Sequence, residues 1–125
     1  MRTGVIIVDH GSRMAESNQL LESVAKAFGS RFGERFRIVE PAHMELASPT
    51  IADAYAKCVD RGAEFVLVVP YFLGPGKHWT QDIPALAEAA AKNHPGTKFK
   101  VTGFLGLDEA MLELLARRIE ESLPR

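Results

Sequence analysis

Four short apolar or alternating runs, at residues 5–8, 36–39, 65–69 and 98–102, are separated by stretches whose apolar residues recur every three or four positions. This alternation is typical of βα repeats. The first periodic stretch, residues 16–28, predicts a helix that ends near Gly29 and Gly33. Its inner face carries Leu20, Leu21, Val24, Ala25 and Phe28.

Capping residues place the remaining helices. Ser48 is a good N-cap with Pro49 at the first helical position, and Gly62 ends that helix. A third helix begins near Asp82, because Pro84 has to lie in the first turn. Asp108 is expected to cap the last helix. Its predicted core face consists of Leu112, Leu115 and Ile119.

The two kinds of strand predict a topology. The runs at 5–8 and 65–69 are apolar throughout, so these strands are expected at the sheet centre with both faces covered. The runs at 36–39 and 98–102 alternate with Lys or Arg, which suits edge strands. Right-handed crossovers then give a small doubly wound, four-stranded parallel sheet of order 2-1-3-4. Ligands bind such sheets beyond the carboxyl ends of the strands, here between strands one and three.

Composition narrows the class of protein. The 125 residues fit one domain spanning 1–125, with 46% hydrophobic residues and a net charge of −1. We therefore expect neither a nucleic-acid partner nor a membrane span, which needs roughly 20 apolar residues. The single Cys58 excludes an internal disulfide and a Cys-cluster zinc site. It favours a cytoplasmic protein, or one of the plastid stroma if a transit peptide has been removed.

Three histidines follow predicted strands and are expected on the same rim of the sheet: His10, His43 and His78. His10 directly follows the first strand, where it is either a capping residue or a metal ligand and general base. His78 lies in a Gly/Pro-rich loop, where it is either an exposed loop residue or a second ligand. Together the pair favours a functional site. His94 ends a helix and suits the surface.

Other rim residues leave alternatives open. Glu45 is either a solvated loop charge or a ligand, and a structural role is favoured for Asp9. The loop at residues 72–76 offers apolar surface and backbone N–H groups to a large planar ligand. Tyr71 and Trp79 are either stacking surfaces or core residues.

Several α/β chemistries lack their residues here. No phosphate-binding P-loop occurs, and the position after strand three holds Pro70 rather than the aspartate of a response-regulator receiver. A hydrolase would have to use Ser12, which has no nearby Asp–His pattern.

Three segments resemble the short sirohydrochlorin chelatases, the class II tetrapyrrole chelatases that insert cobalt or iron. They are residues 8–13 (VDHGSR), 40–49 (EPAHMELASP) and 74–84 (GPGKHWTQDIP). The resemblance covers nearly the whole length. The phrases around His43 and His78 look most like the iron-inserting branch, which makes sirohaem. The Cys-rich tail of its plant members has no counterpart, so no permanently bound cofactor is implied.

The resemblance implies roles for individual residues. His10 and His78 match the metal-handling histidines, and His10 also matches the proton acceptor. Glu45 matches an acidic residue near the metal and the substrate. The loop that contacts the macrocycle is matched by Phe72, Leu73, Gly74, Pro75, Gly76 and Lys77.

The implied reaction is insertion of a divalent metal into sirohydrochlorin. The tetrapyrrole loses two protons as the metal enters; a neutral imidazole accepts one and a carboxylate relays the other. Fe²⁺ is favoured as the metal substrate, although Co²⁺ and Ni²⁺ also suit these ligands. Arg13 and Lys77 are expected to anchor substrate carboxylates. A homodimer is expected, because one rim of a small domain offers a broad disc a single wall. The alternative function is a non-catalytic metal or tetrapyrrole carrier.

Overall fold

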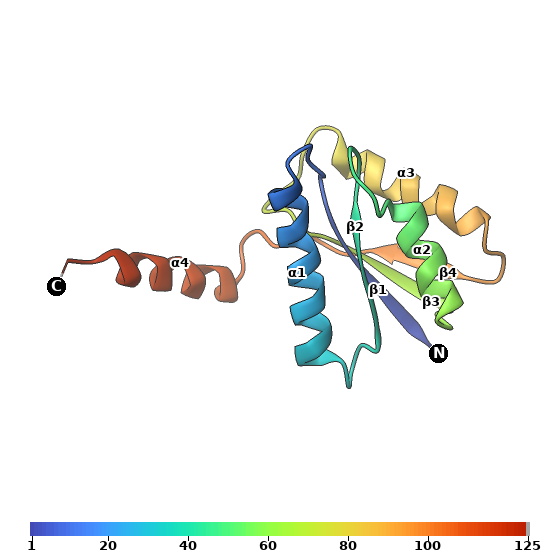
Figure 1. The fold of residues 1–125 in the computed structure, drawn as a ribbon, viewed down its shortest axis with the longest axis horizontal. Coiled ribbons are helices and arrows are strands. Elements are labelled where there is room, and N and C mark those ends of the chain that lie inside the picture. Colours follow the sequence, from blue (N-terminus) through green and yellow to red (C-terminus); the bar gives the residue numbers. More distant parts are fainter. Residues whose placement is uncertain (125) are drawn as a thin grey trace.

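The computed structural model describes residues 1–124, which form strands and helices in strict alternation (Figure 1). The strands are β1 (Thr3–Asp9), β2 (Ile38–His43), β3 (Phe65–Pro70) and β4 (Lys98–Val101). The helices are α1 (Ala15–Phe32), α2 (Ile51–Asp60), α3 (Trp79–Lys92) and α4 (Glu109–Ser122). All strand pairs are parallel and the order is β2-β1-β3-β4, so the predicted fold and strand order are confirmed.

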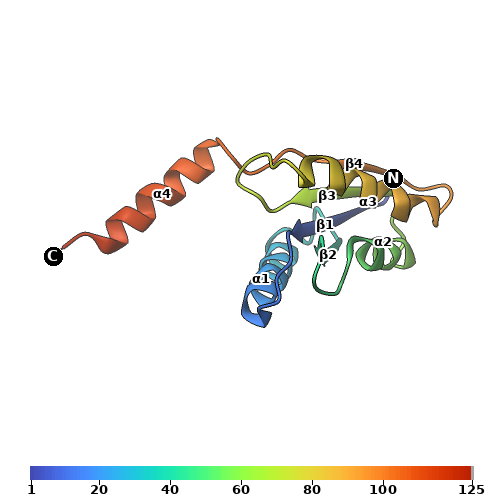
Figure 2. The same ribbon diagram turned by 90° about the horizontal axis from the view of Figure 1, so that it is seen from above.

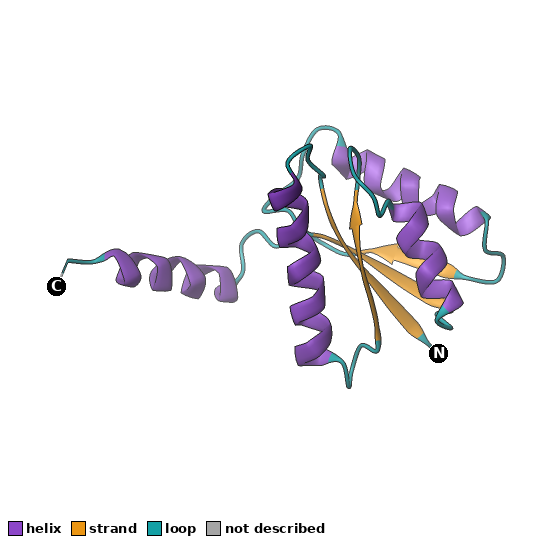
Figure 3. Cartoon of the chain, in the orientation of Figure 1, coloured by secondary structure: helices purple, strands orange, loops and turns teal. Residues whose placement is uncertain are grey.

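Helices lie on both sides of the sheet (Figure 3). On one face, Ile6 and Val8 of β1 join Val66 and Val68 of β3 in a core closed by α2 and α3. On the other face, the remaining β1 side chains pack against α1 in a smaller cluster of Val5, Ile7, Leu21 and Ala25. Strand β1 is therefore buried on both sides, as its uninterrupted apolar sequence predicts.

Strand β3 is less completely covered than its sequence predicts. Val66, Val68 and Pro70 are buried, whereas the alternate residues Phe65 and Leu67 are only half-buried. These two side chains lie on the face that α1 covers for β1 and β2. No helix of residues 1–124 completes that layer over β3 and β4.

The helix that could complete it, α4, projects away from the sheet (Figures 1 and 2). Asp108 caps it as predicted, its side chain accepting a hydrogen bond from the Ala110 N–H. The predicted core face is wrong for this chain alone. Leu112, Leu115 and Ile119 are 46%, 59% and 62% exposed, and α4 has no buried residue. The periodicity shows that the helix is amphipathic, but not which surface its apolar side contacts.

Several boundaries differ from the sequence-based ones. Helix α1 continues through Gly29 to Phe32. Helix α2 is capped by Thr50 in a capping box with Asp53, and the expected cap Ser48 lies before it, joined to Pro49 by a cis peptide. A side chain that bonds reciprocally with the helix backbone defines the cap better than proximity to a proline does.

Proline positions account for two further corrections. Helix α3 starts at Trp79, so Pro84 lies inside it rather than in its first turn. It removes one backbone hydrogen bond from the helix. Strand β2 runs to His43 and includes Pro41. A proline is tolerated there because β2 is an edge strand with one unpaired side.

Two findings bear on the class of protein. Within residues 1–124, no helix combines the length and apolar character needed to cross a bilayer. Cys58 is fully buried, and burial, assisted by the charge of Glu40, raises the pKa of its thiol to about 12. The thiol is therefore protonated and unsuited to metal binding or nucleophilic chemistry.

Candidate functional site at the carboxyl ends of the strands

His10 and Glu45 meet just beyond the carboxyl end of β1. The His10 Nε2 lies 3.3 Å from the Glu45 Oε1, and the two side chains are 47% and 53% exposed. Backbone hydrogen bonds hold their loops together: the Met44 N–H donates to the Asp9 carbonyl at 2.9 Å, and the Glu45 N–H donates to the His10 carbonyl at 3.1 Å. The chain therefore fixes the positions of both residues while leaving their side chains open to solvent.

Gly11 permits this close approach. Its φ is +91°, a conformation that residues with a side chain rarely adopt. A Cβ at this position would overlap the Glu45 carbonyl oxygen. Any larger residue would separate the loop after β1 from the loop after β2.

The pair is suited to receive a cation or a proton. The His10 Nδ1 lies 3.3 Å from the Gly11 carbonyl oxygen, which accepts a hydrogen bond when Nδ1 carries the proton. The Nε2 lone pair of that neutral tautomer faces the Glu45 carboxylate. Two electron-rich atoms at this separation favour a proton or a metal ion between them.

His78 is not joined to this pair as a third ligand. It is exposed at the N-cap of α3, where its side chain makes no capping hydrogen bond. Among residues 1–124, no three His, Cys, Asp or Glu side chains are grouped closely enough to hold a metal. Two of the three predicted ligands are therefore brought together, and the third lies in the segment next to them.

Aromatic side chains of that segment border the pair. The Trp79 ring lies edge-on to His10 at a centroid distance of 5.9 Å, and Phe72 lies 4.9 Å from Trp79. Trp79 Nε1 donates to the Gly74 carbonyl at 3.4 Å, which folds the loop over its own ring. Trp79 and Phe72 pack partly against the core, so both readings of Trp79, stacking surface and core residue, apply to it.

The rest of the loop at residues 72–77 is open. Leu73 is 69% exposed, and Pro75 and Lys77 are also exposed. A Cβ at Gly76 would overlap the Trp79 ring, so this glycine is required for the loop to close on the tryptophan. The loop presents apolar surface and one cation beside the His10–Glu45 pair.

His43 lies beneath the rim instead of on it, contrary to the sequence-based expectation. It is the last residue of β2 and is fully buried. Its Nδ1 lies 2.7 Å from the Asp9 Oδ1, and its Nε2 lies 3.1 Å from the Glu22 Oε2. Both ring nitrogens therefore face carboxylate acceptors, which only the doubly protonated imidazolium satisfies.

The charge state of His43 follows from opposing effects. Burial lowers the pKa, but hydrogen bonds to Asp9 and Glu22 and the negative charge of both carboxylates outweigh it and raise the pKa of His43 above 6.5. The imidazolium ties the ends of β1 and β2 to α1. The sequence gave no sign of this network beyond the assigned structural role of Asp9, and Glu22 was missed because its partner is 21 residues away.

Ser12 is engaged in loop structure. Its Oγ accepts a hydrogen bond from the Met14 N–H at 2.9 Å, and its backbone groups bond with the Asn18 side chain. These contacts order the entry to α1 and provide no base, so they do not support the hydrolase alternative. Arg13 beside it is exposed and open to a ligand.

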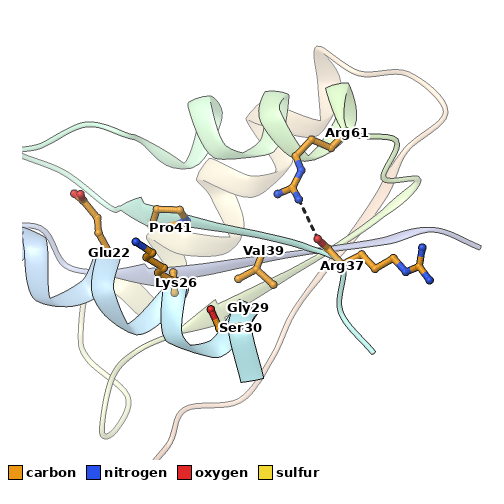
Figure 4. A pocket seen from close by; sticks show the side chains of 9 residues that line it. Glu22, Lys26, Gly29, Ser30, Arg37, Val39, Pro41 and Arg61 are labelled. Carbon is orange, nitrogen blue, oxygen red and sulfur yellow. Dashed lines mark hydrogen bonds between the residues drawn. The ribbon is translucent and has the colours of Figure 1, made fainter. Parts of the chain in front are cut away.

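Hollows on the surface lie around the pair rather than at it. The largest, about 440 Å³, lies between α1 and the β2 edge and is lined by Lys26, Val39 and Arg61 among others (Figure 4). There the Arg61 guanidinium donates to the Arg37 carbonyl and to Glu40, so its charge is already used. A hollow of about 340 Å³ is lined by Glu45 and by Asp82 of α3. It extends the polar surface of the site toward α3.

Known proteins resemble this chain along nearly all of its length. A model of the CbiX family matches residues 4–122. The chloroplastic sirohydrochlorin ferrochelatase of Arabidopsis thaliana is 49% identical over 120 residues, 96% of this chain and 52% of the plant protein. The sirohydrochlorin cobaltochelatase of Sulfurisphaera tokodaii is 32% identical over 120 residues, 96% of this chain and 93% of that protein. The structure of SirB from Bacillus subtilis with Fe³⁺ superposes with a TM-score of 0.84 at 28% identity, over 99% of this chain and 49% of that one.

The relatives thus fall into two lengths. The chain spans about half of the plant and Bacillus proteins and almost all of the archaeal one. Each of the two fold elements that carry the site, the end of β1 and the loop after β2, lies inside the matched region.

Proposed function

The chain belongs to the CbiX family, and on that premise we propose that it inserts a divalent metal into sirohydrochlorin with release of two protons. The observation that carries this proposal is the half-exposed His10–Glu45 pair, 3.3 Å apart at the carboxyl end of β1 and bordered by Trp79. An imidazole and a carboxylate held by backbone contacts can take up a metal ion and a proton without rearrangement of the fold. Such preorganisation is what a transfer reaction requires.

Few protein ligands suit the delivery of a metal. A closed tetrahedral site binds its metal too tightly for release, whereas one nitrogen and one oxygen hold it weakly enough to pass to four ring nitrogens. His10 accepts one pyrrole proton at Nε2, and Glu45 relays the second to solvent. His78, exposed at the start of α3, supplies a further ligand as the metal approaches or leaves.

Fe²⁺ is the metal substrate we favour. The plant relative, named a ferrochelatase, shares 49% of residues, and the archaeal relative, named a cobaltochelatase, shares 32%. Imidazole and carboxylate bind Fe²⁺, Co²⁺ and Ni²⁺ alike, so ligand chemistry does not discriminate among them. The site geometry is compatible with each.

The macrocycle rests against the loop at residues 72–77. Leu73 and the partly buried Phe72 offer apolar contact to the ring, while Lys77 and Arg13 offer cations to its carboxylates. Backbone N–H groups of Gly74 and Gly76 add donors. One rim provides a single wall, so we propose that the working unit is a homodimer with the substrate between protomers.

We propose a cytoplasmic location on the evidence of the single cysteine, whose buried thiol takes part in no disulfide. The plant relative is named as chloroplastic. Fractionation of the source cells with an antibody to the chain tests the compartment directly.

The decisive experiment is an anaerobic steady-state assay with sirohydrochlorin and Fe²⁺, Co²⁺ or Ni²⁺. Catalytic turnover, many products per protein, is expected with Fe²⁺ fastest. A single stoichiometric uptake of metal or tetrapyrrole without turnover would identify a carrier and contradict the enzyme. A faster Co²⁺ reaction would keep the enzyme and reverse the metal.

A further inference from the structure

Helix α4 presents an apolar stripe that nothing in residues 1–124 covers. Leu112, Leu115 and Ile119 recur at helical spacing, and each is close to half exposed or more. A soluble amphipathic helix is stabilised mainly by packing its apolar face, and a lone helix of 14 residues is marginal in water. The stripe therefore calls for a partner surface.

The same chain carries an uncovered sheet surface of the matching kind. On the α1 side of the sheet, Phe65 and Leu67 of β3 are only half-buried. Beside them in the sheet register lie Lys98 and Lys100 of β4, both exposed. We call this surface, made of Phe65, Leu67, Lys98 and Lys100, the open β3–β4 face.

The charges of the two surfaces are complementary. With about 3.6 residues per turn, Glu109 and Glu120 flank one side of the α4 stripe. The open β3–β4 face has its two lysines along one side, next to its two apolar residues. A helix laid on this face would place leucines on Phe65 and Leu67 and carboxylates near the lysines.

The connection to α4 directs the helix away from its own sheet. The Thr102 N–H donates to the Val68 carbonyl at 2.9 Å, and the Leu105 N–H donates to the Phe72 carbonyl at 2.9 Å. The chain is thus fixed to its own domain as far as Leu105. A return to its own open face would require a reversal between Leu105 and the cap Asp108, whereas Figure 2 shows α4 continuing outward.

The lengths of the relatives suggest where the partner surface comes from. SirB from Bacillus subtilis matches 99% of this chain with 49% of its own length, so that protein has about as much chain again. A short chain obtains an equivalent neighbour by pairing with a second copy.

We propose that α4 of one copy packs on the open β3–β4 face of a second copy, and reciprocally, so that two chains exchange their C-terminal helices. This inference rests on the proposed homodimer and specifies its interface. The connection leaves from the carboxyl end of β4, the same end of the sheet as His10 and Glu45. The exchange therefore brings the two rims toward each other, as a substrate held between two walls requires.

The first test is the oligomeric state of a matched pair of variants. Leu115→Arg buries an unpaired charge if the exchange exists, and should weaken dimerisation about 100-fold or more in sedimentation equilibrium. Leu20→Arg is the control, because Leu20 of α1 is 62% exposed, close to the 59% of Leu115. It should remain dimeric. A monomeric wild type, or a Leu115→Arg chain that stays dimeric, overturns the exchange.

The second test separates exchange from packing of α4 on its own sheet. A Leu67→Cys chain is mixed with a Leu115→Cys chain and treated with a short bis-maleimide; Cys58 is buried and does not interfere. Exchange yields a cross-linked pair containing one chain of each kind. A cross-link that forms only within a chain carrying both substitutions overturns the proposal. Neither test uses metal or sirohydrochlorin, so a chain that exchanges helices yet inserts no metal would contradict the proposed reaction alone.

Discussion

Two neighbouring strands, β1 and β2, each bring a histidine to a carboxylate at their carboxyl ends, yet the two histidines have opposite surroundings. His10 is 47% exposed and faces Glu45 at 3.3 Å. His43 is fully buried, with Asp9 at 2.7 Å and Glu22 at 3.1 Å. The same pair of residue types therefore serves two tasks, and burial together with the number of partners decides which.

The buried histidine has no freedom to change partners. With a carboxylate at each nitrogen, His43 is held as an imidazolium, and removing the proton would bring a lone pair against a negative oxygen. His10 has one carboxylate, a backbone carbonyl and solvent, so it can exchange a proton or take up a metal. The buried network supports the exposed pair, because Asp9 precedes His10 and His43 lies two residues before Glu45.

The largest expected effect separates the two histidines by activity. His10→Ala should lower metal insertion by about 10³-fold, because the proton acceptor and metal ligand are lost. The free energy of unfolding should change by no more than about 0.5 kcal/mol, as is usual for a half-exposed side chain. The assay is turnover of sirohydrochlorin with Fe²⁺, combined with urea unfolding. His94→Ala, a histidine stacked on Tyr55 away from the rim, is the control and should keep its turnover.

The converse expectation concerns stability. His43→Ala should lower the free energy of unfolding by roughly 3 kcal/mol, because it leaves Asp9 without its buried partner. Urea unfolding followed by circular dichroism measures this. If His43→Ala were as stable as the wild type, the buried network would not be holding the strand ends, and the contrast with His10 would disappear.

Glu45→Gln tests the charge of the exposed pair at nearly constant shape. The rate of insertion should fall about 10- to 100-fold, within the range of a proton-transfer group, while the affinity for sirohydrochlorin changes much less. Single-turnover rates and a binding titration separate the two quantities. Equal losses in rate and affinity would instead identify Glu45 as a substrate anchor.

The fold was predictable because its signals are local. The uninterrupted apolar run of β1 places it at the centre of the sheet, and the alternating run ending at Val101 places β4 at an edge. The position of α4 was not predictable, since Leu112, Leu115 and Ile119 show only that the helix has an apolar side. Contacts that depend on a surface outside the periodic segment leave no mark in the period.

The site was predictable only in part, for a related reason. His10 follows a central strand directly, so its position at the rim follows from topology. His43 was misplaced because β2 extends through Pro41, and its burial depends on Asp9 and Glu22 from other elements. His78 follows a loop of eight residues after Pro70, and topology does not determine where the tip of such a loop lies.

His78→Ala should have a smaller effect than either change in the His10–Glu45 pair. Because His78 is exposed and lies outside a three-ligand cluster, its loss should raise the half-saturating Fe²⁺ concentration about tenfold and leave the maximal rate nearly unchanged. Rates measured over a range of Fe²⁺ concentrations test this. A large loss of maximal rate at saturating metal would place His78 beside His10 in the reacting complex.

The smallest expected effect is a pH dependence that belongs to the buried histidine alone. The pKa of His43 in the folded protein is raised above its ordinary value of 6.5, so between these two values the folded state holds a proton that the unfolded chain has lost. The stabilisation is complete below about pH 6.5 and is lost as the pH rises through the folded-state pKa. The slope cannot exceed about 1.4 kcal/mol per pH unit for one proton. Urea unfolding at several pH values above 6.5 should show this decline in the wild type and in His10→Ala, and its absence in His43→Gln. Parallel curves for wild type and His43→Gln would mean that the imidazolium is not what joins β1, β2 and α1.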